Sequence, residues 1–287
     1  MKLKILAKVP LVLLENILFS IFPNLRPFIE RYCFNPLDFK ESHRNYSQGK
    51  FREFQERIGP YATLENHVLL EIGPGGSIGF GIIALENGLK RYIALDDGIH
   101  TFIKSRQLRT YEKLVKNTTS LQRYFIRKNG KVTYNNSVIT LANIHQKSRY
   151  PLPENSVDII YSCAVLEHVH NLELCFSEMA RVLKNGGLMY HEVDLRDHIF
   201  SQENLYFLTM RDFWFRTLFR NTGGYVNRKR LSAYRQLAHT YGFTILSLVP
   251  TIAYQGNDDE LPKTLRTKYS KEDIQTLAFI IILQKSE

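Results

Sequence analysis

The residues with the clearest chemical potential lie around a glycine-rich turn. The segment E-I-G-P-G-G-S-I-G at 71–79 follows the short apolar run 68–72. Glycines let the chain turn tightly and bring backbone N–H groups against a ligand. A dinucleotide fingerprint would need glycine at position 78, where the chain has Ile78. Glu71, two residues before the first glycine, would repel a pyrophosphate and attract a cation, so we predict a ligand with an ammonium group.

A second acidic residue stands where a ribose is commonly bound. Asp96 follows the apolar run 92–95 and lies 21 residues after Gly75. A carboxylate in this place can accept hydrogen bonds from both ribose hydroxyls. The alternative is that Asp96 only begins a turn. The order of strand, glycine turn and acid favours the ligand-binding interpretation.

Two further groups of side chains could supply a general base. Glu167 and His168 follow a later apolar run, and His191, Asp194 and His198 end or follow the next one. A histidine oriented by a carboxylate can accept a proton near neutral pH, and the same residues could bind a divalent metal. They could instead form ion pairs, caps or core contacts. We predict His168, His191, Asp194 and His198 as catalytic residues and assign no residue to a metal.

The elements that position these residues alternate between strand and helix. Seven apolar runs are typical of buried strands: 68–72, 92–95, 138–144, 157–162, 188–193, 244–249 and 277–283. Helical patterns occupy 78–86, 99–128, 172–183 and 231–241. The alternation predicts an α/β fold with a doubly wound, mostly parallel sheet and a ligand site at the carboxyl ends of its strands.

Three ordered motifs carry a resemblance to a known family. Residues 68–79 resemble motif I of class I S-adenosylmethionine-dependent methyltransferases, the pattern hydrophobic-E-x-G-x-G. Residues 156–169 resemble the fourth-strand motif of the methyltransferase type 11 family, and 180–187 resemble its turn into strand five. The resemblance covers about 65–195 and implies a seven-stranded, Rossmann-like methyltransferase sheet with S-adenosylmethionine as cofactor.

The resemblance also implies which residues bind the cofactor. Glu71 and the backbone of Gly73 and Gly75 would hold the methionine part, and Asp96 would hold the ribose. The adenine would be bound by the loop after the third strand. The family often has an acidic residue followed by a small residue there, and this sequence does not.

In the adenine loop, the sequence Leu-Ala-Asn-Ile at 141–144 leaves Asn143 as the candidate adenine partner. After the fourth strand, Ser162, Cys163 and Ala164 would line the sulfonium end.

The acceptor is predicted from less specific features. The segment 199–230 after strand five is rich in aromatic residues, namely Phe200, Tyr206, Phe207, Phe213, Trp214, Phe215, Phe219 and Tyr225. Basic residues are interleaved with them, namely Arg211, Arg216, Arg220, Arg228, Lys229 and Arg230. This insert could be a lid over an aromatic or glycosyl acceptor, a platform for RNA bases, or a helical cap with a basic outer face. We predict methyl transfer to an oxygen of a small-molecule or glycoconjugate acceptor, with an RNA methyltransferase or an inactive methyltransferase fold as alternatives.

The length of the chain indicates its domain organisation, and its charge and cysteines indicate its surroundings. We predict an N-terminal helical extension at 1–60 and a methyltransferase domain at 61–287 that includes the insert. The formal net charge of +10 suggests an anionic neighbour such as nucleic acid, a membrane surface or a phosphorylated substrate. The three cysteines have no metal-binding spacing and indicate a cytoplasmic protein with reduced thiols.

The N-terminal segment 1–23 could contact a membrane without crossing it. We predict that Pro10 begins a helix ending before Pro23, with Leu11, Leu14, Leu18 and Phe22 on one face. The apolar stretch is too short to span a bilayer.

Lys2, Lys4 and Lys8 would lie near anionic lipid if this helix were peripheral at the inner membrane surface. The helix could equally cap the domain or form a dimer contact, and the oligomeric state is left open.

Overall fold

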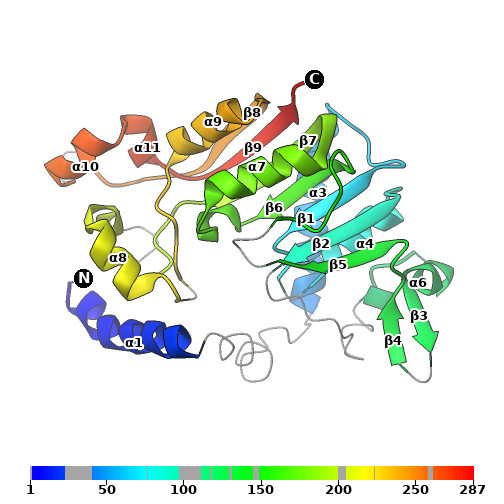
Figure 1. Cartoon of the computed structure of the whole chain (residues 1–287), viewed down its shortest axis with the longest axis horizontal. Helices are drawn as coiled ribbons and strands as arrows, with labels where there is room; N and C mark the ends of the chain where they lie inside the picture. Colours follow the sequence, from blue (N-terminus) through cyan, green and yellow to red (C-terminus); the bar gives the residue numbers. More distant parts are fainter. Residues whose placement is uncertain are drawn as a thin grey trace.

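A seven-stranded sheet forms the centre of the protein (Figure 1). The computed structural model describes residues 2–22, 41–75, 77–96, 111–116, 118–128, 131–144, 149–199, 205–222, 224–257 and 261–287. Within these residues the strand order is β5-β2-β1-β6-β7-β9-β8. The strands are β1 (Val68–Ile72), β2 (Arg91–Asp96), β5 (Ile139–Asn143), β6 (Val157–Cys163), β7 (Leu183–Asp194), β8 (Phe243–Ala253) and β9 (Thr276–Lys285). Only β9 runs antiparallel to its neighbours, which confirms the predicted mostly parallel, doubly wound sheet.

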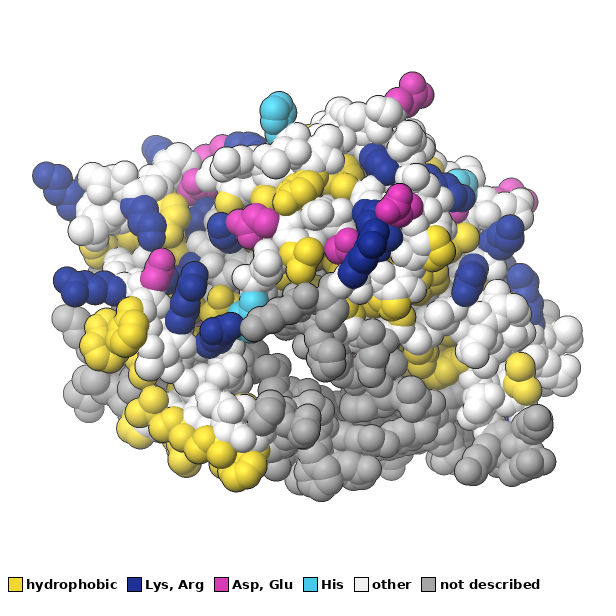
Figure 2. Space-filling view, in the orientation of Figure 1, with side chains coloured by type: hydrophobic (Ala, Val, Ile, Leu, Met, Phe, Trp, Pro, Cys, Tyr) yellow, Lys and Arg dark blue, Asp and Glu magenta, His cyan; other side chains and the backbone are white. Residues whose placement is uncertain are grey.

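The N-terminal helix differs from its prediction in where it begins. Helix α1 (Lys2–Ile21) contains Pro10 in its interior, so the prediction that Pro10 begins the helix is wrong. Proline removes one backbone hydrogen bond, but Pro10 is exposed, so its ring does not displace packed side chains. Helix α1 lies beside α8 (Asp212–Phe219), and hydrophobic side chains are visible along it in Figure 2. Among the described residues, no helix has the length and apolar character needed to cross a bilayer.

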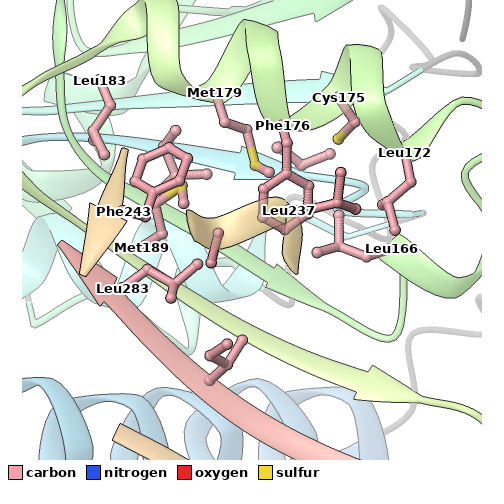
Figure 3. Close-up of a cluster of buried hydrophobic side chains, with 14 of the residues drawn as sticks. Leu166, Leu172, Cys175, Phe176, Met179, Leu183, Met189, Leu237, Phe243 and Leu283 are labelled. Atoms are coloured by element: carbon pink, nitrogen blue, oxygen red, sulfur yellow. The ribbon is translucent and has the colours of Figure 1, made fainter. Parts of the chain in front are cut away.

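Helices cover both faces of the sheet. Helices α3 (Glu41–Ile58) and α4 (Gly79–Glu86) pack on one face, and α7 (Leu172–Val182) and α9 (Leu231–Thr240) pack on the other. Figure 3 shows the second layer, in which side chains of α7 meet those of α9 and the strands. Burial on two sides explains why the central strands read as continuous apolar runs rather than as alternating ones, whereas the edge strand β8 is largely exposed.

Helix α3 belongs to the core although it lies within the predicted extension 1–60. Phe51 and Phe54 of α3 are buried against Phe80 of α4, with ring centroids 5.4 to 5.8 Å from Phe80. Phe54 also packs edge-on against Tyr161 of β6. The helix therefore covers the sheet directly. The division of the chain at residue 60 remains a prediction.

The segment predicted as one helix at 99–128 is partly a hairpin. Residues 99–110 lie outside the described residues. Helix α6 (Thr118–Tyr124) is followed by β3 (Phe125–Lys128), which pairs antiparallel with β4 (Lys131–Tyr134). Phe125 pairs with Tyr134, with ring centroids 5.5 Å apart. This cross-strand packing outweighs the local helical tendency of the segment.

The insert 199–230 packs largely on itself and on the C-terminal helices. Its described elements are η2 (Tyr206–Thr209) and α8. Phe207, Phe215 and Phe219 are buried with residues of α10 (Lys263–Lys268) and α11 (Lys271–Gln275). Phe200 and the side chain of Tyr206 lie outside the described residues. Most of the described aromatic side chains therefore stabilise the insert itself.

Arg230 is the clearest exception to a basic outer face. Its side chain is buried and donates hydrogen bonds to the carbonyl oxygens of Leu195, Asp273 and Thr276 at 2.5 to 2.9 Å. The interpretation of Arg230 as an exposed basic residue is therefore wrong. Five donors in a fixed planar group suit this junction between the insert and the sheet.

Candidate cofactor and acceptor site

The register of the sheet brings the predicted residues to one edge. Ile72 of β1 pairs with Leu95 and with Ser162, and Ser162 pairs with His191 of β7. The carboxyl ends of the parallel strands therefore lie together, and the loops that follow them are adjacent.

Two hollows at this edge share Gly73 as a lining residue. The first, here called the apolar hollow, contains about 620 Å³ of space outside the protein atoms, part of it open to solvent. Asp96, Ile144, Val165 and His168 are among its lining residues. The second, here called the polar hollow, contains about 580 Å³, and residues lining it are Tyr46, Lys50, Glu71, Ser77 and Cys163. One extended ligand could thus contact both hollows past Gly73.

Gly73 must be glycine for two reasons. Its φ is +68°, in the left-handed region that side chains disfavour. A Cβ atom there would lie 2.5 Å from the side chain of Val165. The N–H of Gly73 also donates to the carbonyl oxygen of Leu95 at 2.8 Å, which fixes the turn. Gly75 has a φ of +61° and lies in the same loop, whereas Gly76 is outside the described residues.

Glu71 is buried at the end of β1 and faces the polar hollow. Burial raises its pKa to about 8, and the charge of Asp96 adds to the rise, although Tyr92 donates a hydrogen bond to its carboxylate. Gly81 leaves room for this tyrosine, because a Cβ there would lie 2.4 Å from the Tyr92 ring. A cationic group in the polar hollow would stabilise the ionised carboxylate.

Asp96 ends β2 and lines the apolar hollow. Its backbone carbonyl accepts a hydrogen bond from Ile144 at 3.0 Å, and it pairs with Asn143 in the sheet. The side chain of Asn143 lies outside the described residues, but the adjacent Ile144 lines the hollow. A carboxylate beside apolar walls suits a ribose joined to a flat heterocycle.

The three residues predicted at the sulfonium end take three different positions. Ser162 is fully buried, and its hydroxyl shares a hydrogen bond of 2.8 Å with Nδ1 of His191. Cys163 lines the polar hollow. Ala164 follows with a φ of +52°, and its N–H donates to the carbonyl oxygen of Glu192 at 3.0 Å. A non-glycine residue in this conformation is strained, and such strain often accompanies functional sites.

Three of the four predicted catalytic residues lie together. The Nδ1–H of His168 donates to the carbonyl oxygen of Tyr225 at 2.5 Å. The His168 ring lies 4.9 Å from the ring of His198, and Nε2 of His198 lies 3.4 Å from Oδ2 of Asp194. Burial would raise the pKa of Asp194, but contacts with His198 and Arg196 hold it well below its usual range. The carboxylate is therefore ionised. Arg196 donates to both of its oxygens, whereas Nε2 of His198 lies at ion-pair distance without a hydrogen bond among the described residues.

His191 lies apart from the other predicted catalytic residues. It is fully buried on the face of β7 that packs with Met189 and Val193 under α7 and α9. Burial lowers its pKa to about 3, and among the described residues it does not line either hollow. The structure thus places His191 in the core. Its predicted catalytic role has no geometric support from the described residues.

Sequence reasoning missed the residues that α3 and Glu192 contribute. Nζ of Lys50 lies 2.5 Å from Oε2 of Glu192, and the Cys163 thiol donates to the same carboxylate at 3.3 Å. The hydroxyl of Tyr46 lies 3.6 Å from Sγ of Cys163. Burial lowers the pKa of Lys50, but Glu192 outweighs this effect and raises it overall. Burial also raises the pKa of Cys163 to about 12, so its thiol stays protonated.

The signals for these residues were weak. Tyr46 and Lys50 are more than a hundred residues from Cys163 and Glu192 along the chain, so no spacing connects them. Glu192 neighbours His191 in the strand, and successive side chains of a strand face opposite sides. The sequence alone does not tell which of the two faces the site.

Glu167 is a buried carboxyl group next to His168. Burial raises its pKa to about 8, and the charge of Asp194 adds to this rise, whereas backbone N–H groups of Glu167 and Asp194 oppose it. Among the residues that the structure describes, no three histidine, cysteine, aspartate or glutamate side chains are grouped to hold a metal ion.

Comparison with known families matches the segment of the chain that contains most of these residues. Residues 70–191 match a family model described as a methyltransferase domain. The chain carries a class I S-adenosylmethionine-dependent methyltransferase domain. S-Adenosylmethionine is its cofactor. The matched segment includes the glycine turn, Asp96 and His168 of this methyltransferase, whereas α1, α3 and α8 lie outside it.

Solved structures share the fold of the methyltransferase at low identity. A sarcosine dimethylglycine methyltransferase candidate from Galdieria sulphuraria is 16% identical, with a TM-score of 0.51, and the alignment covers 83% of this chain and 86% of that one. An S-adenosylmethionine dependent methyltransferase from Mesorhizobium loti is 14% identical, with a TM-score of 0.47, over 78% of this chain and 93% of that one. A search of curated proteins finds no match to the sequence. These likenesses concern the fold and leave the acceptor undecided.

Proposed function

We propose that this methyltransferase transfers a methyl group to an oxygen of a small-molecule or glycoconjugate acceptor. S-Adenosylmethionine supplies a methyl group on a positively charged sulfur, which is ready for displacement by a nucleophile. The chain must therefore hold an acceptor oxygen in line, exclude water and accept its proton.

In this proposal, each of the two hollows binds a different part of the cofactor. In the polar hollow, Glu71 would bind the ammonium group, and the Lys50 ammonium would attract the carboxylate. The backbone of Gly73 and Gly75 would contact the methionine part of the cofactor. In the apolar hollow, Asp96 would accept hydrogen bonds from the ribose. An Asp96→Ala variant should then bind S-adenosylmethionine about 2 kcal/mol more weakly, because ribose hydroxyls lose their acceptor.

The observation that carries the choice of oxygen is the contact between His198 and Asp194. An ionised aspartate 3.4 Å from an imidazole stabilises, through its charge, the imidazolium formed when the ring accepts a proton. His198 also lies against His168, which lines the apolar hollow. A hydroxyl acceptor needs such a base, whereas an amine that is already neutral does not.

Labelled S-adenosylmethionine tests the proposal directly. A cell extract is incubated with the enzyme and the labelled donor, and the products are separated into small-molecule, glycoconjugate, RNA and protein fractions for mass spectrometry. Label on an oxygen in either of the first two fractions supports the proposal. Label in RNA would favour the alternative of an RNA methyltransferase, and binding without any transfer would favour an inactive fold.

Matched histidine variants test the role of the base. His198→Ala and Asp194→Asn should each lower turnover by about 100-fold, with little change in S-adenosylmethionine affinity. His239→Asn on the exposed side of α9 is the control and should retain turnover. Full activity in both site variants would contradict the assignment of a His198 base.

The membrane contact predicted for residues 1–23 is a separate proposal. It depends on the surface of α1 and not on the chemistry of the two hollows.

A further inference from the structure

Helix α1 presents an apolar stripe to solvent. Leu11, Leu14 and Ile21 are 69%, 62% and 63% exposed, and Phe22 directly after the helix is 57% exposed. Ile17 lies on the same stripe and is also exposed. These positions recur every three or four residues, which places them on one side of the helix.

The side of α1 that faces the protein is mixed, with Val12 packed against the buried cluster of the insert and polar contacts beside it. Asn16 is buried and donates to the carbonyl oxygen of Thr217 at 2.6 Å, while its own side-chain oxygen accepts from the N–H of Asn221 at 3.0 Å. Ser20 accepts a further hydrogen bond from the Asn221 side chain at 2.7 Å. At 3.6 residues per turn, Asn16 lies roughly opposite the apolar stripe. The helix is thus attached by polar contacts and by Val12, with a second apolar stripe turned away from the protein.

Helix α8 adds two exposed aromatic side chains beside this contact. Phe213 is 68% exposed and Trp214 is 54% exposed, and their rings meet edge to face at 5.2 Å. They precede Thr217 by three and four residues on the helix whose C-terminal end, at the Thr217 carbonyl oxygen and Asn221, contacts α1. Figure 2 shows hydrophobic side chains along α1 and over α8, with Lys and Arg side chains nearby.

The charges around these aromatic side chains are mainly positive. Arg211, Arg216 and Arg220 are exposed on or next to α8. The acidic residue of the helix, Asp212, is paired with Arg228. An apolar and aromatic surface with arginines at its border fits the interface of a bilayer that contains anionic lipid.

We propose that the α1–α8 surface, formed by the exposed stripe of α1 together with Phe213 and Trp214, docks onto an anionic lipid bilayer. The stripe and the aromatic rings enter the interface, and the arginines contact lipid phosphates. A second copy of the chain is a poorer occupant, because symmetric pairing would bring the same arginines towards each other.

Trp214 is the single tryptophan of the chain and reports on this surface directly. Full-length protein is titrated with vesicles of phosphatidylcholine alone or with phosphatidylglycerol added, at low and high salt. We expect Trp214 emission to shift to shorter wavelength, and the protein to sediment, with the anionic vesicles at low salt. High salt should reverse much of the binding, since surface charges are screened. Unchanged emission and no sedimentation with anionic vesicles would overturn the proposal.

Two double variants with the same change of net charge distinguish the role of this surface from a general effect of charge on lipid binding. Leu14→Glu combined with Ile21→Glu should weaken binding to anionic vesicles at least about tenfold, because each change removes apolar contact and adds repulsion. The control combines Tyr61→Glu with Ile126→Glu, two exposed apolar positions elsewhere, with the same change of net charge. The control should bind within about twofold of wild type.

Equal losses of vesicle binding in both double variants would show that net charge alone drives binding and would overturn the proposal.

Light scattering without lipid provides a further test. A dimer that dissociates only in the Leu14→Glu, Ile21→Glu protein would assign the surface to a second copy instead. Retained S-adenosylmethionine affinity in all variants shows that each is folded.

Discussion

Nζ of Lys50 lies 2.5 Å from Oε2 of Glu192, and this contact joins α3 to β7 beside the polar hollow. Both side chains are partly shielded, with 22% and 25% of their surfaces exposed. A pair of this kind is screened less than a surface ion pair and still keeps contact with water. Through it, a helix outside the matched methyltransferase segment helps to form the wall of the polar hollow.

A double-mutant cycle should detect the Lys50–Glu192 pair. Lys50→Met, Glu192→Gln and the double variant are compared by urea unfolding. We expect a coupling free energy of about 1 kcal/mol, because the two charges are only partly shielded from solvent. Strictly additive effects would show that the contact contributes no coupling to folding. The exposed pair of Arg235 and Glu272 is the control, and its coupling should be smaller.

Gly73→Ala should weaken cofactor binding far more than a loss of folding stability alone would explain. The added Cβ strains a left-handed residue and lies 2.5 Å from Val165, where the two hollows meet. We expect S-adenosylmethionine, which should bind wild type in the micromolar range (about −8 kcal/mol), to bind at least about tenfold more weakly. Calorimetry measures the affinity of each protein.

Gly242→Ala is the matched control for this glycine. Its φ of +73° imposes the same backbone strain, but no atom lies within 4 Å of the added Cβ. It should lose about 1 kcal/mol of stability and keep its affinity for the cofactor. Equal affinity losses in the two variants would contradict the role of the Gly73 turn in binding.

The raised pKa of Glu71 predicts a characteristic pH dependence. The folded protein holds this proton more tightly than the unfolded chain, so its stabilising contribution is complete below about pH 4.5 and is lost as pH rises to about 8. Wild type should therefore lose stability relative to Glu71→Gln as pH rises through this window. Cofactor affinity should rise over the same window in wild type only, since the ammonium group prefers the ionised carboxylate. Urea unfolding and calorimetry at several pH values measure both, and parallel curves for the two proteins would contradict the assignment.

His191 should act on stability in the opposite direction. Its pKa is lowered to about 3, so the unfolded chain binds the proton more tightly than the folded one. Its stabilising contribution is present above about pH 6.5 and is lost as pH falls towards about 3. The stability of His191→Asn should therefore fall less steeply on acidification than that of wild type. A turnover–pH profile that loses its acidic limb in this variant would instead support the predicted catalytic role of His191.

Arg230→Lys should destabilise the protein although it preserves the charge. A lysine ammonium cannot reach three carbonyl oxygens in the planar arrangement that Arg230 uses, so buried acceptors would lose their donors. We expect a loss of about 3 kcal/mol in the free energy of unfolding. The exposed Arg216→Lys is the control and should change stability by less than about 0.5 kcal/mol. Similar small effects in both variants would contradict the role of the Arg230 contacts.

The sequence by itself located the residues of the proposed cofactor site. Glu71, Gly73 and Asp96 are recognisable because each stands at a set position relative to a strand, and parallel strands bring their carboxyl ends to one edge. The central strands were predictable for a related reason: burial on both faces makes them continuous apolar runs, whereas the edge strand β8 is apolar although most of it is exposed. These are local patterns, and local patterns can be read without coordinates.

Only the tertiary structure decided which polar residues meet. Lys50 and Glu192 are 142 residues apart, and no spacing rule predicts their contact. Alternation along β7 requires His191 and Glu192 to face opposite sides, but packing of α3 and α7 on the sheet decides which side holds the site. The orientation of α1 likewise depends on Asn16 and its partners in α8, because hydrophobic periodicity locates a stripe without showing what it faces.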